Sequence, residues 1–363
     1  MFRVPQRALL CPSHFLGLNN ETMVLPSELA LLTSLSRLNI SQGSVSGTFP
    51  SEFGNLAHLQ SLQLSSIKGG LTGSIPTEVG LLTSLTDLTL SGNSLTGSIP
   101  SQIGYLTGLS TLSASNNHLA GSIPTELGLL TKLTNLELYS NSLGGKIPSQ
   151  LGLLSNLTFL SLYLNALNGI IPTEIGSLSY LQKFEASFNY LAGSLPSEIG
   201  QLSNLWSLQV TSNYLSGAIP SEIGFLSGLT HFLLSENVLT GTIPSEIGYL
   251  TKLKYFTLWR NSISGSIPTQ IGHLRSLVAM DLSTNFLVGH VPTELAMLPN
   301  LGVVYINNND LTGTVEGILC PQHVFGTFVD ALGNQYDFTL LADCNKVACA
   351  CCTQCCPGGS SCR

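Results

Sequence analysis

Eight of the nine cysteines fall near the carboxyl end of the chain, where they could form disulfides or hold a metal ion. An even number of cysteines in a short segment without a large core is typical of a disulfide framework. Cys352 and Cys355, however, have the C-x-x-C spacing of a thiolate metal site. We expect a disulfide-stapled cap and no metal, with the pairing left open. The eight residues are Cys320, Cys344, Cys349, Cys351, Cys352, Cys355, Cys356 and Cys362.

A second set of candidate residues is aromatic or charged and recurs between residues 137 and 260. Exposed aromatic side chains accompanied by a few charges are typical of binding surfaces. The alternative is that these rings only stabilise a sheet by stacking across neighbouring strands. We expect a peptide or protein ligand at these residues, which are Glu137, Tyr139, Phe159, Tyr163, Lys183, Glu185, Phe188, His231, Tyr255, Trp259 and Arg260.

Other kinds of function find little support in the composition and motifs. The sequence has no Gly-rich phosphate loop, nucleophile elbow or zinc-protease helix, so we expect no catalysis and no cofactor. A net charge of −7 argues against nucleic acid, which usually requires a basic face. No apolar run approaches the roughly 18 residues of a membrane helix, and we expect no transmembrane segment in this chain.

The elements that must position these residues come from one repeat. "LTSLTDLTLSGNSLTGSIPSQIGY", which begins at Leu82, returns every 24 residues as far as Leu298, and earlier copies begin at Leu32 and Leu56. Positions are counted here from the first leucine of each copy. Leucines at positions 1, 4, 7, 9 and 14 and Ile at 18 are predicted to form the core. Asn at 12 should satisfy backbone groups, Gly at 16 should allow close approach, and Pro at 19 should open a helical turn.

This pattern predicts a leucine-rich-repeat solenoid. The phrase "LTGSIP" resembles the plant-type repeats of receptor-like kinase and receptor-like protein ectodomains, over about residues 25–315. The resemblance implies an α/β solenoid, a right-handed superhelix with a parallel concave β-sheet. It also implies a second short strand at L-x-G-x-I and short 3-10 or helical turns on the convex side. The cysteine tail is similar to that of diatom leucine-rich-repeat proteins.

The repeat pattern divides the chain into three predicted parts. Residues 1–31 are predicted to be a degenerate repeat or truncated cap, in which Cys11 is a small apolar core residue. Residues 32–316 hold twelve repeats, and residues 317–363 form the cysteine-rich cap that a solenoid end requires. The amino-terminal segment has no clear signal peptide, and we expect the chain to begin within a longer solenoid.

Two surfaces of the solenoid are candidate binding faces. The aromatic and charged residues occupy mainly positions 6, 8, 10 and 11, which are predicted to face the concave side, with Tyr190 and Tyr214 beside them. The outer copies are expected to present small polar residues there. Strands about 4.8 Å apart would give a track of about 24 Å, enough for about seven peptide residues.

On the convex side, Ser or Thr follows the Pro at position 20 in most copies, from Thr77 to Thr293, and Glu is frequent at position 21. Helix-start chemistry explains these rows, because hydroxyls and carboxylates suit the exposed N–H groups there. A hydroxyl lattice at fixed spacing could also bind ice or a polysaccharide.

The cysteines and three N-glycosylation motifs, at Asn20, Asn39 and Asn156, favour an extracellular or cell-surface location. We therefore predict a receptor-like recognition module that binds a peptide or protein ligand on its concave face, with a membrane co-receptor as a further candidate partner. The alternative is a structural or adhesive protein that binds ice or wall polysaccharide through the convex Ser/Thr rows.

Overall fold

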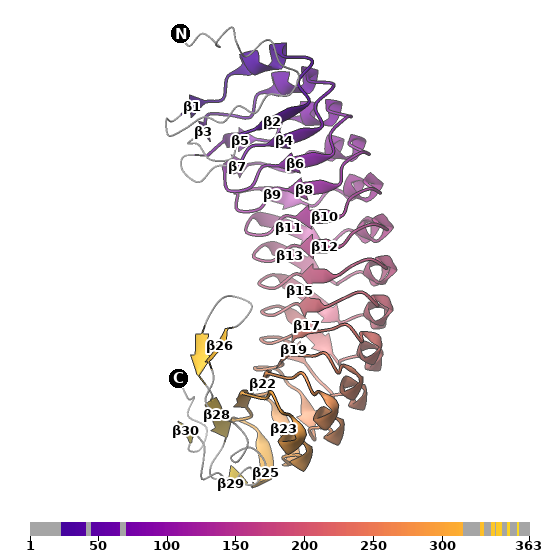
Figure 1. Ribbon diagram of the computed structural model, residues 1–363, viewed down its shortest axis with the longest axis vertical. Helices are drawn as coiled ribbons and strands as arrows, with labels where there is room; N and C mark the ends of the chain where they lie inside the picture. The colour runs from indigo at the N-terminus through magenta and orange to yellow at the C-terminus, as the bar shows by residue number, and fades with distance from the viewer. Residues whose placement is uncertain are drawn as a thin grey trace. The chain divides into compact units, whose positions relative to one another are not determined.

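The computed structural model describes residues 23–40, 45–65, 70–314, 327–329, 335–337, 339–342, 347–348 and 354–355. The chain divides into two compact units, Met1–Leu181 and Gln182–Arg363, and each unit is described by itself. In both units, the coils place strands of the main sheet on one side and 3-10 turns on another (Figure 1). The predicted twelve-repeat segment spans the boundary between the units. Most of the predicted amino-terminal repeat, Cys11 included, lies outside the described residues.

The first unit contains a parallel main sheet in which one short strand comes from each coil. Neighbouring strands are offset by one repeat, so that Leu88 lies opposite Leu112 and Leu136 opposite Leu160. Its strands, in order, are β2 (Arg37–Asn39), β4 (Ser61–Gln63), β6 (Asp87–Thr89), β8 (Thr111–Ser113), β10 (Asn135–Glu137) and β12 (Phe159–Ser161).

Shorter lateral strands and five-residue 3-10 helices complete each coil of the first unit. The lateral strands are β1 (Met23–Val24), β3 (Val45–Ser46), β5 (Thr72–Ser74), β7 (Ser94–Thr96), β9 (Ala120–Ser122), β11 (Ser142–Lys146) and β13 (Ala166–Gly169). The 3-10 helices are η2 (Ser27–Leu31), η3 (Ser51–Asn55), η4 (Thr77–Leu81), η5 (Ser101–Tyr105), η6 (Thr125–Leu129), η7 (Ser149–Leu153) and η8 (Thr173–Ser177).

The second unit repeats this arrangement. Its main sheet contains β14 (Lys183–Glu185), β16 (Ser207–Gln209), β18 (His231–Leu233), β20 (Tyr255–Thr257), β22 (Ala279–Asp281) and β24 (Val303–Tyr305). The lateral strands are β15 (Tyr190–Ser194), β17 (Tyr214–Gly217), β19 (Val238–Leu239), β21 (Ser264–Gly265), β23 (Phe286–His290) and β25 (Asp310–Thr314). The 3-10 helices are η9 (Ser197–Gln201), η10 (Ser221–Phe225), η11 (Ser245–Tyr249), η12 (Thr269–His273) and η13 (Thr293–Met297).

The carboxyl-terminal segment adds further strands to the second unit. β28 (Thr339–Ala342) pairs in parallel with β24, and β30 (Gln354–Cys355) pairs with β28. β29 (Val347–Ala348) pairs with β25, and β26 (Thr327–Val329) forms an antiparallel pair with β27 (Gln335–Asp337). Within the described parts of the predicted cap, β28, β29 and β30 therefore continue the parallel sheets, whereas β26 and β27 form a separate pair. Its cysteines lie outside the described residues, except for the backbone of Cys355, and the disulfides stay a prediction.

The core confirms the predicted leucine pattern. In the copy that begins at Leu82, the side chains at positions 1, 4, 7, 9, 14 and 18 are all at most 3% exposed. Position 22, which was not predicted, is equally buried, as in Ile103 and Leu127. Pro precedes every described 3-10 helix, which confirms the predicted turn opening. The described turns are short 3-10 helices rather than α-helices.

The asparagine at position 12 satisfies backbone groups as predicted, and it does so between coils. The Nδ2 of Asn117 donates to the carbonyl oxygen of Leu90 in the preceding coil at 2.9 Å and to that of Ala114 at 3.0 Å. Its Oδ1 accepts from the Leu95 amide at 3.0 Å. Because nearly every copy repeats this set of hydrogen bonds, the asparagines connect adjacent coils as well as closing each turn.

Two glycine positions and one turn position set the shape of each coil. Gly97 at position 16 has φ of +73°, and a Cβ there would lie 3.3 Å from the Cβ of Ser74. Gly152 at position 23 is tighter, since a Cβ would lie 2.4 Å from the carbonyl oxygen of Glu174. At position 11 the chain adopts left-handed φ even with non-glycine residues, including Leu164 at +55° and Phe188 at +57°. This conformation, which was not predicted, turns the chain into the asparagine.

Candidate functional site

The candidate site lies on the sheet face, which we define as the side of the main sheet that points away from the leucine core. Because side chains alternate along a strand, the central residue at position 7 is buried while positions 6 and 8 point outward. Phe184, Phe232 and Phe256 fill position 7 in three coils of the second unit and are fully buried. The predicted ligand residues at positions 6 and 8 therefore lie on the sheet face.

In the first unit, the predicted residues form a small aromatic pair beside a carboxylate. The rings of Tyr139 and Tyr163 stack with their centres 4.5 Å apart and 7° between their planes. Glu137 accepts a hydrogen bond from the Ser113 hydroxyl at 2.9 Å. Phe159, on β12, is half-buried. These four predicted residues thus lie on or just after β10 and β12.

In the second unit, a longer row of side chains crosses four consecutive coils. The Nζ of Lys183 lies 5.9 Å from the ring centre of Trp206, and Trp206 meets His231 edge to face at 5.7 Å. His231 meets the ring of Tyr255 at 4.6 Å. We call these four residues the aromatic ladder. Lys183 also pairs with Glu185 at 2.6 Å.

The ladder keeps its histidine neutral at physiological pH. Burial lowers the pKa of His231 to about 4, and the positive charges of Lys254 and Lys183 act in the same direction. The Thr230 hydroxyl lies 2.8 Å from the Nδ1 of His231. Burial also raises the pKa of Tyr255. The three rings of the ladder are therefore uncharged and partly exposed, and the Lys183–Glu185 ion pair lies at one end of them.

A carboxyl group farther along the same sheet is also perturbed by its surroundings. Burial raises the pKa of Asp281 on β22 to about 6, although hydrogen bonds from Ser283 oppose the shift. The Ser283 hydroxyl donates to Oδ1 of Asp281 at 2.6 Å and the Ser283 amide donates to the same atom at 3.0 Å. A fraction of Asp281 is thus protonated close to neutral pH.

The left-handed turns place the remaining predicted residues along one rim of the second unit's sheet face. Arg260 forms an ion pair with Glu236 at 3.1 Å, and Glu236 accepts from the Ser212 hydroxyl at 2.5 Å. Phe188 is 42% exposed. Trp259, next to Arg260, is half-buried. The rings at the start of the lateral strands also stack, with the centres of Tyr190 and Tyr214 6.1 Å apart.

Two parts of the sheet face were not predicted from the sequence. Trp206 occupies position 5, which was assigned no role, yet its ring joins Lys183 to His231. Arg37 and Asp87 occupy position 6 two coils apart, in a region expected to carry only small polar residues. The available signal for Trp206 was a large ring at a position that most other copies fill with Ser, Thr or Gln. Arg37 and Asp87 stand out only against Ser61 and Thr111, which occupy position 6 in the neighbouring copies.

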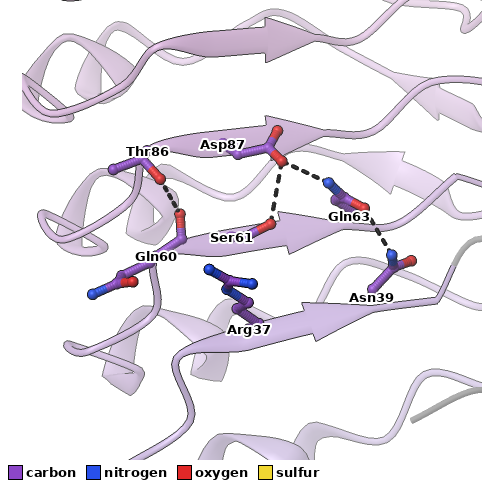
Figure 2. Close-up of a pocket in the computed structure, with 7 residues that line it drawn as sticks. All are labelled: Arg37, Asn39, Gln60, Ser61, Gln63, Thr86 and Asp87. Carbon is purple, nitrogen blue, oxygen red and sulfur yellow. Dashed lines mark hydrogen bonds between the residues drawn. The ribbon is translucent and has the colours of Figure 1, made fainter. Parts of the chain in front are cut away.

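Arg37 and Asp87 line a polar pocket of about 340 Å³ on β2, β4 and β6 (Figure 2). Asn39 donates to Gln63 at 2.8 Å, and Gln63 donates to Oδ2 of Asp87 at 2.6 Å. The Ser61 hydroxyl also donates to Oδ2 of Asp87, at 3.2 Å. These hydrogen bonds fix the floor of the pocket.

The Ser/Thr row on the 3-10 side is exposed, but one part of its expected explanation is wrong. The position-20 hydroxyls do not cap the helices, since the capping residue is Pro and makes no side-chain cap. They donate instead to the neighbouring Glu, as Thr77 does to Glu78 at 3.1 Å. The reason is that Ser or Thr is itself the first helical residue. The Glu residues do lie in the first turn, as expected.

The glycosylation motifs have different surroundings. Asn156 is exposed, and its Nδ2 donates to the Thr131 carbonyl oxygen at 2.8 Å. Asn39 is half-buried in the polar pocket, whereas Asn20 lies outside the described residues. Within the described ranges, no group of three or more His, Cys, Asp or Glu residues is placed to hold a metal ion. No described helix is long and apolar enough to cross a membrane.

Comparison with known proteins supports the repeat assignment. The leucine-rich-repeat family model matches residues 84–106, 108–130, 132–154, 228–250 and 252–274. A search of curated proteins finds no match. Among solved structures, the ectodomain of the Arabidopsis receptor kinase HAESA in complex with an IDA peptide hormone is 32% identical, with a TM-score of 0.76. The match covers 84% of this chain and 51% of HAESA's.

Two other solved structures are covered more completely. A leucine-rich-repeat protein of Leptospira interrogans, LIC12759, is 30% identical with a TM-score of 0.59, over 86% of this chain and 83% of that one. A plant ice-binding protein is 32% identical with a TM-score of 0.57, over 63% and 74%. The chain spans about half the length of the plant receptor ectodomains that it matches. It therefore belongs to the leucine-rich-repeat family, with repeats of the plant receptor type.

Proposed function

We propose that this chain is a non-catalytic recognition module that binds an extended peptide segment on the sheet face of its second unit. The observation that carries the proposal is the aromatic ladder. Three rings occupy consecutive coils and remain partly exposed, although a sheet could be stabilised by smaller side chains. Partly exposed aromatic side chains next to charged groups are the residues that dominate binding energy at protein interfaces.

The charges around the ladder give the proposed ligand an orientation. Lys183 and Glu185 lie at one end, and Glu236 and Arg260 lie on the rim. Between them the neutral His231 and the Trp206 ring offer apolar faces. A peptide with an apolar or aromatic side chain between polar residues would match this order.

Relatives support the class of ligand and the location. The HAESA ectodomain is bound to a peptide hormone, and a second HAESA structure contains the co-receptor SERK1. By this similarity, the proposed setting is extracellular or at the cell surface, with a membrane co-receptor as a further partner. The predicted disulfide cap and the glycosylation motifs fit the same setting.

The two tryptophans of the chain, Trp206 and Trp259, both lie in the second unit on or beside this face. Intrinsic fluorescence therefore reports directly on the proposed site. A library of synthetic peptides is titrated into the protein, and we expect binding peptides to shift or quench the emission. Tyr255→Ala should weaken such binding at least tenfold.

The matched control is Tyr249→Ala, which removes the same side chain from η11, where it is 66% exposed outside the sheet face. This variant should bind as the unmodified protein does. Equal loss in both variants, or none in either, would show that the ladder does not bind the peptide.

A second candidate is adhesion to ice or wall polysaccharide through the exposed position-20 row. It is favoured by the similarity to a plant ice-binding protein and by hydroxyls that are exposed in successive coils. Inhibition of ice recrystallisation by the purified protein would be the first test. Under this alternative, replacing Thr77, Ser101 and Thr125 together by Lys would abolish the inhibition, whereas Tyr255→Ala would leave it unchanged.

A further inference from the structure

The polar pocket of the first unit lies outside the proposed peptide site and is chemically different from it. All seven lining residues are polar or charged: Arg37, Asn39, Gln60, Ser61, Gln63, Thr86 and Asp87. None of the seven offers an aromatic ring on which a base or an aromatic side chain could stack. Recognition by these residues must therefore rest on hydrogen bonds and charge.

Two opposite charges face this pocket without pairing with each other. Figure 2 shows Arg37 reaching from β2 toward Ser61, and Asp87 extending from β6 toward Ser61 and Gln63. No described residue accepts a hydrogen bond from the Arg37 guanidinium, which has five N–H donors and is exposed. The guanidinium is thus available to an anion.

Asp87, in contrast, is already held in place. Its Oδ2 accepts from Gln63 and Ser61, and its Oδ1 accepts from the Thr89 hydroxyl at 3.2 Å. A carboxylate has about four acceptor positions, so one remains for a ligand. Arg37 thus offers donors at one side of the pocket, and Asp87 offers an acceptor.

We propose that this pocket binds a small zwitterion of the α-amino-acid type. The ligand carboxylate would accept the paired N–H groups of Arg37, a geometry in which guanidinium and carboxylate match. The ligand ammonium would donate to the free position of Asp87. A monoanion would face the Asp87 charge and a monocation would face Arg37, so a ligand with one charge of each sign is favoured over either.

The first test uses the unmodified protein and needs no variant. L-alanine, propionate, ethylamine and glycine betaine are compared by isothermal titration calorimetry. L-alanine should bind with a dissociation constant on the order of 1 mM, which is within the range of very small ligands. Propionate and ethylamine, each with one charge, should bind at least tenfold more weakly. Glycine betaine has no ammonium N–H and should also bind more weakly.

The second test assigns the binding to this pocket. Arg37→Gln and Asp87→Asn each remove one charge and keep a polar side chain, and each should weaken L-alanine binding at least tenfold. Glu52→Gln changes an exposed carboxylate on η3, outside the pocket, and should leave binding unchanged. Circular dichroism checks that each variant is folded.

Either of two results would overturn the proposal: no binding of L-alanine, or binding that the pocket variants leave unchanged. Binding of galactose that is lost in the same variants, without binding of L-alanine, would also overturn it, by identifying the ligand as a saccharide. Peptide binding by the aromatic ladder is independent of all these results, because its test uses Tyr255 in the second unit.

Discussion

The sheet faces of the two units are built on the same backbone but hold their side chains by different forces. On β2, β4 and β6 of the first unit, Asn39, Gln63, Ser61 and Asp87 form a hydrogen-bonded chain with distances of 2.6–3.2 Å. In the second unit, the ladder from Lys183 to Tyr255 relies on ring contacts at 4.6–5.9 Å.

This difference shows which positions of the repeat can vary without disturbing the fold. The leucines, the asparagine and the glycines fix where positions 5, 6 and 8 lie, because each is required by the coil itself. The side chains at positions 5, 6 and 8 are under no such requirement, so the same scaffold can present a polar pocket or an aromatic surface. Binding specificity can therefore change from coil to coil without altering the fold.

The largest expected effect concerns the shared scaffold, where the two units should behave alike. Asn117 and Asn237 are both buried and make the same hydrogen bonds to their own and the preceding coil. Replacing either by Ala leaves buried backbone groups unpaired, and each substitution should lower the free energy of unfolding by about 3 kcal/mol. Urea unfolding followed by circular dichroism measures this loss.

Asn156→Ala provides the control for this comparison, since this asparagine is exposed and makes one hydrogen bond to Thr131. Its effect should be below about 1 kcal/mol. A large difference between Asn117→Ala and Asn237→Ala would show that the two scaffolds are not equivalent.

The next effect, confined to the second unit, is a pH dependence in which two groups oppose each other. The folded-state pKa of His231 is about 4, below its ordinary value of 6.5, so the unfolded state binds the extra proton and stability falls as pH drops from 6.5 to 4. The folded-state pKa of Asp281 is about 6, above its ordinary 3.8, so stability rises as pH drops through 6 toward 3.8.

Single substitutions should separate these contributions, each of which is worth roughly 1–3 kcal/mol once screening by solvent is included. His231→Gln should leave the Asp281 contribution and make the second unit more stable on acidification, relative to the unmodified chain. Asp281→Asn should do the reverse. Urea unfolding at about pH 4.5, within both transitions, and at about pH 7.5, above both, measures the two effects. Identical profiles for the two variants would contradict the opposed shifts.

Double-mutant cycles compare the forces on the two faces directly. The Gln63–Asp87 pair, a hydrogen bond to a charged group, should show a coupling free energy of about 1.5 kcal/mol that decreases with salt. The His231–Tyr255 ring pair should show about 1 kcal/mol, unaffected by salt while His231 is neutral. Asp87 and Tyr105, which are not in contact in any described interaction, serve as the uncoupled control pair. Similar salt dependence for both pairs would show that the two sheet faces are not held by different forces.

The smallest effect concerns the left-handed turn at position 11, which both units share. Gly92 and Ser140 occupy equivalent turns in the first unit, with φ of +70° and +53°. Ser140→Gly should raise the free energy of unfolding by about 0.5 kcal/mol, because relief of strain exceeds the added chain entropy. Gly92→Ser should lower it by about 1 kcal/mol. Thermal unfolding measures the two shifts, and shifts of the same sign would contradict the strain.

The sequence was sufficient to predict the solenoid, its core leucines, the hydrogen-bonding role of asparagine and the helical turn after proline. Each of these depends on residues within one 24-residue copy, and ten nearly identical copies repeat the same signal. Positions 22 and 23 repeat equally well, but the predicted pattern ends at position 19. The left-handed turn at position 11 could not be predicted from the sequence, because residues as different as Leu164, Phe188 and Arg260 occupy it.

The sequence by itself determined the coil, because hydrophobic spacing, the turn residues and the close approach of glycine are local requirements that recur in every copy. Only the tertiary structure decided the sites. Trp206 meets His231 from a different position of a neighbouring coil, and Arg37 and Asp87 come from coils on either side of Ser61. Such contacts depend on the directions of side chains between coils and on how far water is excluded around them. Neither quantity follows from the spacing of residues along the chain.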